Sequence, residues 1–151
     1  MIRITRQSDY GIVLLAAFAA KGGDSVRTAR DLAAETHVPL PMVGKILKAL
    51  ARGGVLASHR GAKGGYSLAR PVGAITIADV IRALEGPIAI TECLDDEADT
   101  CGIERLCPVR TNWDRINRAI RRALEEIPIS DMLRPITFPA RRALHEAARV
   151  P

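Results

Sequence analysis

The stretch that decides the fold runs from residue 28 to residue 52 and reads TARDLAAETHVPLPMVGKILKALAR. Its first four residues form a capping box, in which Thr28 precedes a helix and Asp31 follows three positions later. The sequence His-Val-Pro at 37–39 ends this short helix, and Pro41 suits the first position of a second one. Two short helices across a tight turn predict a helix-turn-helix.

The second of these helices has one apolar face and one basic face. Apolar residues recur at three- and four-residue spacing, which places them on the inward side. These residues are Val43, Ile46, Leu47 and Leu50. Lys45, Lys48 and Arg52 then face outward, where a polyanion could meet them. Helix pairs are common, so this pattern alone is weak evidence for DNA binding.

A glycine-rich hairpin is predicted directly after the helix pair. Two short strands, VLASHR at 55–60 and YSLAR at 66–70, flank the sequence GAKGG at 61–65, whose glycines permit the positive φ values of a hairpin tip. Arg60 and Lys63 lie at this tip, where cations can contact phosphate or enter a minor groove. A basic hairpin in this position predicts a wing, and it favours duplex DNA over an ordinary solvated hairpin.

Two further helices complete the predicted DNA-binding part. Ser8 is expected to cap a helix from about Asp9 to Lys21, whose nearly all-round apolar composition predicts burial on several sides. A second capping box begins at Thr76 and starts a helix that reaches about Glu85. Gly86-Pro87 stops it.

A long amphipathic helix is predicted from about Pro108 to Ile127. Its apolar stripe consists of Trp113, Ile116, Ile120, Ala123, Leu124 and Ile127. A single helix this far from the N-terminal core needs a partner surface, and we prefer dimerisation to packing on its own domain. A dimer also suits the paired half-sites that helix-turn-helix proteins read.

Together these patterns predict a mainly α protein with a small β-wing. It combines a winged helix-turn-helix domain with a long C-terminal dimerisation helix. We divide the chain into a DNA-binding domain at 1–86, a cysteine-bearing cluster-binding loop at 87–108, a dimerisation helix and cap at 109–135, and a tail at 136–151. The tail is Ala/Arg-rich, consistent with a frayed helix or disorder, and is assigned no function.

Composition narrows the class of protein. The 151 residues carry a net charge of +5, which is unevenly distributed. Residues 1–86 hold 12 Lys/Arg against 6 Asp/Glu, and residues 87–151 hold 10 against 11. A basic N-terminal half suggests a nucleic-acid partner. The sequence shows neither an apolar run of membrane-spanning length nor a signal peptide, so a cytoplasmic protein is expected.

All three cysteines, Cys93, Cys101 and Cys107, fall within one 15-residue window. An odd number so confined suits a metal or redox site better than a disulfide framework. The intervals of seven and five residues do not resemble paired zinc knuckles. From chemistry alone an iron–sulfur cluster, a thiol redox switch and zinc all stay open, with the cluster favoured.

Several pieces of the chain together resemble one known family. They are RITRQSDYG at 3–11, the helix-turn-helix, RGAKGGYSL at 60–68, TIADVIRALEG at 76–86 and the cysteine triplet. Over about residues 1–135 the chain resembles the winged-helix iron–sulfur transcription regulators that include IscR and NsrR. The combination of DYG near the start with TEC and CPVR looks most like the branch that regulates the SUF iron–sulfur assembly operon.

The resemblance implies a homodimeric repressor or activator whose iron–sulfur cluster alters DNA binding. The cluster cysteines of the family correspond to Cys93, Cys101 and Cys107, with 2Fe–2S slightly favoured over 4Fe–4S. Some members place a histidine where this chain has Arg110, which cannot act as a ligand. In others an aspartate of the partner subunit completes the site, so we assign Asp9 of the partner subunit. Other candidates are Glu92, Glu104 and His145.

The expected partners are a double-stranded DNA operator and a second copy of the chain, with neither a membrane nor a small-molecule substrate. The residues expected to contact DNA are Thr28, Pro41, Met42, Lys45, Lys48, His59, Arg60 and Lys63. Ligation between subunits would fix the spacing of the two recognition helices. The main alternative is a cluster-free winged-helix regulator that senses oxidants through thiols. A small metalloenzyme or electron carrier is disfavoured, since the sequence contains no nucleotide-binding loop and no catalytic triad, and we expect no enzymatic activity.

Overall fold

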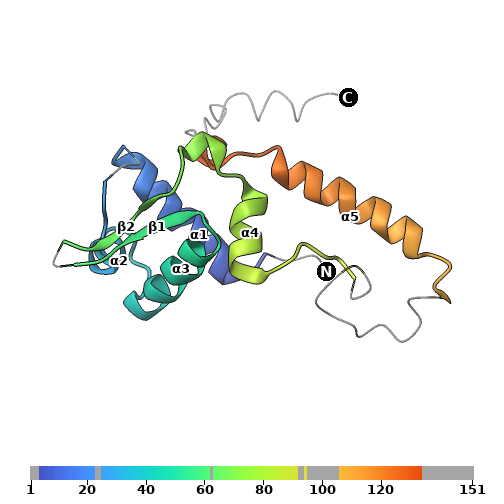
Figure 1. The fold of residues 1–151 in the computed structure, drawn as a ribbon, viewed down its shortest axis with the longest axis horizontal. Coiled ribbons are helices and arrows are strands. Elements are labelled where there is room, and N and C mark those ends of the chain that lie inside the picture. Colours follow the sequence, from blue (N-terminus) through green and yellow to red (C-terminus); the bar gives the residue numbers. More distant parts are fainter. Residues whose placement is uncertain (1–3, 23–24, 62, 92–93, 95–105, 134–151) are drawn as a thin grey trace, which may run out of the picture.

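The computed structural model describes residues 4–22, 25–61, 63–91, 94 and 106–133. In chain order the elements are α1 (Arg6–Ala20), α2 (Ala29–Thr36), α3 (Leu40–Arg52), β1 (Leu56–His59), β2 (Gly65–Leu68), a 3₁₀ turn at Val72–Ala74, α4 (Ile77–Glu85), α5 (Arg110–Glu125) and α6 (Ile129–Met132). Figure 1 shows the wing at one end of the molecule and α5 at the other, with α4 between them. Among the described residues, no helix combines the length and apolar character that crossing a bilayer demands.

A core of aliphatic side chains joins α1, α2, α3 and α4. The inward stripe predicted for α3 is confirmed, because all four of its residues are fully buried. Leu14, Leu15 and Phe18 of α1 and Leu32 of α2 are likewise buried without remaining exposure. The fold prediction of a helical body carrying a small wing is therefore confirmed.

The start of α1 differs from the prediction. Thr5, not Ser8, is the N-cap, and its hydroxyl accepts a hydrogen bond from the Ser8 backbone N–H. Ser8 lies inside the helix, fully buried, and donates its hydroxyl to the Glu85 carboxylate. The physical reason is that two hydroxyl residues three positions apart compete for the cap, and Ser8, which is buried, has an acceptor in Glu85 at the end of α4.

Both predicted capping boxes are confirmed. Thr28 caps α2 together with Asp31, and Thr76 caps α4 together with Asp79. Hydrogen bonds from the side chain and backbone of Thr28 lower the pKa of the Asp31 carboxyl. Gly86 ends α4 with φ at 91°, a conformation that favours glycine.

The wing is an antiparallel hairpin braced by a third segment. β1 and β2 pair in the register that sets Ser58 opposite Tyr66. Arg27 then forms a bridge to the outer edge of β2, with its N–H 2.7 Å from the Tyr66 carbonyl and its own carbonyl 2.8 Å from the Tyr66 N. A Cβ on Gly65 would lie 2.5 Å from the Arg27 carbonyl oxygen, so this close approach requires glycine.

The side chain of Arg27 is also buried and binds two helices. Its guanidinium donates to the Ala17 carbonyl of α1 at 3.0 Å and pairs with the Glu35 carboxylate of α2. A single residue therefore joins the first helix, the helix-turn-helix and the wing.

The junction after α5 is tied to the start of α4. The Ile77 N–H donates to the Ile127 carbonyl at 3.0 Å, and the Ile129 N–H donates to the Ile75 carbonyl at 2.8 Å. Ile129, in the short helix α6, is fully buried. The long helix begins two residues later and ends two residues earlier than predicted, and the short helix α6 is an addition to the predicted elements.

Two glycine substitutions test how the wing is braced. Gly65→Ala should destabilise the protein by about 1–3 kcal/mol, since the new methyl group has to displace the Arg27 backbone. Gly44→Ala is the matched control, because a Cβ there meets nothing within 4 Å in the middle of α3. It should stabilise by roughly 0.5–1 kcal/mol. Urea unfolding measures both; equal stabilities for Gly65→Ala and the parent would contradict the bracing.

Candidate nucleic-acid interface and cysteine segment

The outer face of α3 presents the predicted cations to solvent. Burial of the opposite stripe forces Lys45 and Lys48 outward, and both are exposed. Pro41 is exposed in the first turn, one position later in the helix than predicted. Met42 is only partly exposed, because it packs against the core. Pro41, Lys45 and Lys48 of the predicted DNA contacts are thus exposed on α3.

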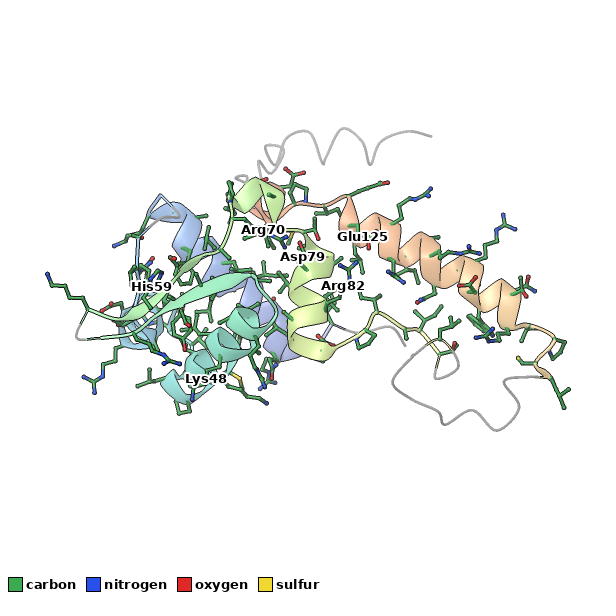
Figure 2. All side chains as sticks on the ribbon, in the orientation of Figure 1. Lys48, His59, Arg70, Asp79, Arg82 and Glu125 are labelled. Atoms are coloured by element: carbon green, nitrogen blue, oxygen red, sulfur yellow. The ribbon has the colours of Figure 1, made fainter. Side chains whose placement is uncertain are left out.

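The wing carries the remaining predicted contacts. Arg60 and Lys63 are exposed at the hairpin tip. His59, shown in Figure 2, is also exposed, and its Nε2 lies 2.8 Å from the Ser67 hydroxyl across the hairpin. The hydroxyl of Thr28 is occupied in the α2 capping box. These bonds give His59 and Thr28 structural roles in addition to any contact with DNA.

A groove of about 530 Å³ separates α3 from the wing. Its lining consists of Lys45, Lys48, Ala51, Arg52, Ser58 and Tyr66. The sequence analysis placed Arg52 on the outward face of its helix but did not select it as a contact. Ser58 and Tyr66 were missed altogether. The alternation of side chains along paired strands could have found them, because opposed residues share one face of a hairpin.

The stretch of chain that lines this groove contains no carboxylate. Between Thr36 and Ala78 the sequence holds six Lys/Arg and no Asp/Glu. This stretch covers α3, the wing and the turn beyond it. The nearest acids along the chain are Glu35, paired with Arg27, and Asp79, which pairs with Arg70 at 2.7 Å. A surface of one sign attracts a polyanion and accelerates its association.

Most of the predicted metal ligands lie outside the described residues. These are Cys93 and Cys101, together with the alternatives Glu92, Glu104 and His145. Cys107 is described: it is a free, partly exposed thiol just before α5. The described residues contain no group of three or more His, Cys, Asp or Glu that could hold a metal ion. A thiolate at Cys107 is a suitable ligand for iron or zinc.

Asp9 lies in the first turn of α1 and is exposed. It lines a groove of about 910 Å³ that also includes Ile12 and, from α6, Met132. The start of α1 and the start of α5, next to Cys107, lie well apart in Figure 1. Within one chain, the first turns of α1 and α5 are therefore not neighbours.

The cysteine-bearing loop at 87–108, called the cysteine segment here, is fixed to α5 near its start by Asn117. The Asn117 side-chain amide donates to the Ile88 carbonyl at 3.0 Å, and its oxygen accepts from the Ile90 N–H at 3.3 Å. Asn117 is the buried residue of α5, with 5% of its surface exposed. Since Cys107 directly precedes α5, both ends of the cysteine segment are attached to the same helix.

A second set of hydrogen bonds joins α1 to the end of α4. The Glu85 carboxylate accepts from the Thr5 hydroxyl at 2.8 Å and from Ser8, and the Gln7 side chain donates to the Leu84 carbonyl at 3.1 Å. The start of α1, which carries Asp9, is therefore bonded to the end of α4, from which the chain continues towards the cysteine segment.

A helix-turn-helix followed by a basic hairpin, on a helical body, defines a winged-helix DNA-binding protein. Residues 4–135 match the Rrf2 family, described as iron-dependent transcriptional regulators. The chain belongs to the Rrf2 family.

Individual relatives agree with this assignment. The chain is 31% identical over 133 residues to protein rrf2 of Nitratidesulfovibrio vulgaris, covering 88% of each chain. It is 30% identical over 131 residues to the regulator CymR of Bacillus subtilis, covering 87% of this chain and 89% of that protein. The structure of B. subtilis CymR, called the global cysteine regulator, matches with a TM-score of 0.65 at 29% identity, over 88% and 97% of the two chains.

The fold also matches that of IscR from T. potens, with a TM-score of 0.62 at 23% identity, over 99% of this chain and 93% of that one. The resemblance to the family that includes IscR and NsrR is therefore confirmed. The protein is a DNA-binding transcriptional regulator, and the prediction that it is not an enzyme is confirmed.

The Asn117 contacts lead to a stability prediction. Asn117→Ala should destabilise the protein by about 1–3 kcal/mol, because it leaves two partly buried backbone groups without partners. Hydrogen exchange at the Ile90 amide should accelerate more than exchange in α3. Asn112→Ala, on the exposed part of the same helix, is the control and should change stability by less than about 0.5 kcal/mol. An unchanged Ile90 exchange rate would show that Asn117 does not hold the segment.

Proposed function

We propose that this chain is a homodimeric transcriptional regulator that senses iron–sulfur, redox or nitric oxide status through an iron–sulfur cluster. Its ligands are Cys93, Cys101, Cys107 and Asp9 of the partner subunit. The cluster is of the 2Fe–2S type, with 4Fe–4S as the alternative. By its resemblance to the SUF regulators, it controls iron–sulfur assembly genes in the cytoplasm.

The observation that carries the DNA-binding part is the basic surface around α3 and the wing, which is free of carboxylates from Thr36 to Ala78. Sequence-independent affinity for DNA comes from Lys and Arg that neutralise phosphates and release counterions. A recognition helix flanked by a basic wing meets this requirement and can also reach base edges.

The sensing part is supported by how the cysteine segment is attached. One end is fixed to α5 through Asn117, and the other continues from Cys107 to the start of α5 at Arg110. The segment departs from α4, which is bonded to the start of α1. A cluster bound by thiolates supplies a centre that gains or loses electrons and reacts with oxidants. Cysteine and aspartate are suitable donors, and the family description, iron-dependent regulators, is consistent with such a centre.

The residues of the protein can transmit a change in the state of the cluster to the DNA-binding surface. Ligation would join the cysteine segment of one subunit to α1 of the other, close to Ser8 and the α4 contact. Releasing the ligands would free the segment and alter the spacing of the two recognition helices. A difference of about 1–3 kcal/mol between the two states is enough to change DNA occupancy about 5- to 150-fold.

Dimerisation is supported by the outer face of α5. The predicted apolar stripe is divided in the structure. Leu124 packs towards the core of its own chain, whereas Trp113, Ile116 and Ile127 stay 40–45% exposed. An apolar face left exposed on a helix this polar is characteristic of an interface. α5 thus contacts its own domain and offers a second face to a partner.

The alternative function is a cluster-free regulator that responds through cysteine oxidation. A specific observation favours keeping it: a structure of CymR from Staphylococcus aureus, described as the oxidised form, matches this chain with a TM-score of 0.63 at 26% identity, over 91% of this chain and all of that one. Cys107, a free and partly exposed thiol, could take part in such chemistry.

Anaerobic purification tests the sensor. The wild-type protein should contain near-equal iron and sulfide, and absorb in the visible region where thiolate ligands transfer charge to iron. Cys93→Ala, Cys101→Ala and Cys107→Ala should each abolish this absorbance and leave a folded dimer. Asp9→Ala should weaken retention of iron, whereas Asp114→Ala on α5 is the control and should leave it unchanged.

The DNA response is measured in the same preparations. A duplex selected from a random pool by the wild-type protein should bind the iron-loaded and iron-free forms with affinities at least about fivefold apart. Iron-free protein from strictly anaerobic cells, together with a disulfide after mild oxidation, would reject the cluster in favour of the thiol switch. A failure to select any duplex would reject DNA regulation itself.

The dimer has its own test. Ile116→Glu should convert the dimer to a monomer, because a carboxylate cannot be buried unpaired in an apolar interface. Asn112→Glu, an exposed position on the same helix, should leave the dimer intact. Analytical ultracentrifugation distinguishes the two. A dimer that persists in Ile116→Glu would place the interface elsewhere.

A further inference from the structure

The groove between α3 and the wing has a composition that suggests a particular ligand. Three cations line it, Lys45, Lys48 and Arg52, together with the hydroxyl residues Ser58 and Tyr66. The grooves along α5 and beside α1 each include a carboxylate, Glu126, Asp114 or Asp9, whereas this lining includes none. A site of cations and hydroxyl donors suits phosphate oxygens.

The three cations of the groove lie along one side of α3. Lys45, Lys48 and Arg52 are spaced by three and four residues, so they occupy one face of α3. In a helix-turn-helix the N-terminal part of the recognition helix reaches the bases, and later residues approach the rim of the groove. Arg52, the last residue of α3, is therefore placed at the rim and next to the wing.

The opposite wall is held in position by the hairpin. Ser58 and Tyr66 are directly opposed across β1 and β2, so their side chains project from the same face. Tyr66 is further fixed by its two backbone hydrogen bonds with Arg27. Only Gly53, Gly54 and Val55 separate α3 from β1, and the Val55 N–H donates to the Leu50 carbonyl at 2.9 Å. The width of the groove is thus set by the fold before any ligand arrives.

The geometry of duplex DNA then identifies the ligand. With α3 in the major groove and the wing tip in the adjacent minor groove, one sugar-phosphate strand has to pass between them. Resting on the DNA-binding function proposed above, we infer that the α3–wing groove is a cradle for this strand. Arg52 and Lys48 bind its phosphates by charge, and the Tyr66 hydroxyl donates a hydrogen bond to a neighbouring phosphate with Ser58 beside it. Lys45, nearest the N-terminus of α3, lies at the mouth of the cradle that faces the bases.

This assignment separates residues that position the protein from residues that read sequence. Phosphate contacts hold the register of the duplex and contribute equally to every sequence. Arg52 and Tyr66 should therefore govern affinity without changing operator preference. The exposed residues in the first turns of α3 are left to read the bases.

Salt dependence of binding tests the cradle. The probes are the duplex selected by the wild-type protein and an unrelated duplex of equal length. Arg52→Ala should reduce the slope of log Kd against log salt concentration by about 1.8, two contacts per dimer at about 0.9 each. It should weaken both duplexes by a similar factor, roughly tenfold near physiological salt. Arg52→Lys should restore most of the slope.

Tyr66→Phe separates the hydrogen bond from the charge. It should weaken both duplexes about 3- to 10-fold while leaving the salt slope unchanged, since it removes one neutral donor. Arg115→Ala is the matched control, because it removes the same charge from an exposed position on α5, away from the wing. It should leave the slope within about 0.5 of the wild-type value, and ultracentrifugation verifies that each variant stays dimeric.

Neutral methylphosphonates locate the contact on DNA. Replacing single phosphates on the strand between the contacted major and minor grooves should weaken the wild-type protein and have little effect on Arg52→Ala. If Arg52→Ala leaves the steep salt slope of the wild-type protein unchanged and Tyr66→Phe leaves its affinity unchanged, the cradle is overturned and the DNA-binding function still stands. Absence of wild-type binding to either duplex would overturn both.

Discussion

The position of the wing depends on one buried guanidinium. Arg27 binds the Ala17 carbonyl and the Glu35 carboxylate through its side chain, while its backbone forms the third segment of the hairpin. A buried cation without partners would be strongly unfavourable, so the three surrounding elements must keep these positions for the arginine to stay satisfied. The first helix, the helix-turn-helix and the wing therefore behave as one unit, and the angle between α3 and the hairpin follows from it.

A second chain of contacts connects that unit to α5. Arg70, Asp79, Arg82 and Glu125 form a row of ion pairs from the end of the wing, across α4, to α5 (Figure 2). All four side chains are partly exposed, so the pairs contribute little to stability. The stronger link is the backbone pairing of Ile75 and Ile77 with the segment after α5, together with the buried Ile129. The helix to which the cysteine segment is attached is thus joined through α4 to the helix-turn-helix domain.

The features that the sequence predicted well are local. The stripe of α3, the capping boxes at Thr28 and Thr76, and the glycine-rich wing each depend on residues a few positions apart. The features that were missed depend on contacts between distant segments. Ser8 does not cap α1 as expected, because its hydroxyl binds the carboxylate of Glu85, 77 residues away. Asn117 lies among the apolar residues of α5, where its side chain binds the Ile88 carbonyl and the Ile90 N–H.

The candidate site shows the same difference between features set by nearby residues and features set by distant segments. Helical periodicity placed Lys45 and Lys48 correctly, since burial of one face exposes the other. The alternation of side chains along the strands could have found Tyr66, whereas its bridge to Arg27 depends on a distant segment and could not be read from a periodic pattern. The proposed fourth cluster ligand, Asp9, would come from a second subunit, and local spacing in one chain carries no information about that geometry.

Trp113 gives the molecule a built-in optical reporter. It is the single tryptophan of the chain, it lies in the first turn of α5 six residues after Cys107, and 40% of its surface is exposed. Indole emission depends on the polarity around the ring and is quenched by energy transfer to nearby coloured metal centres. Unlabelled protein therefore carries a fluorophore at the junction of the cysteine segment and the outer face of α5, so events at either place can be followed by emission in real time.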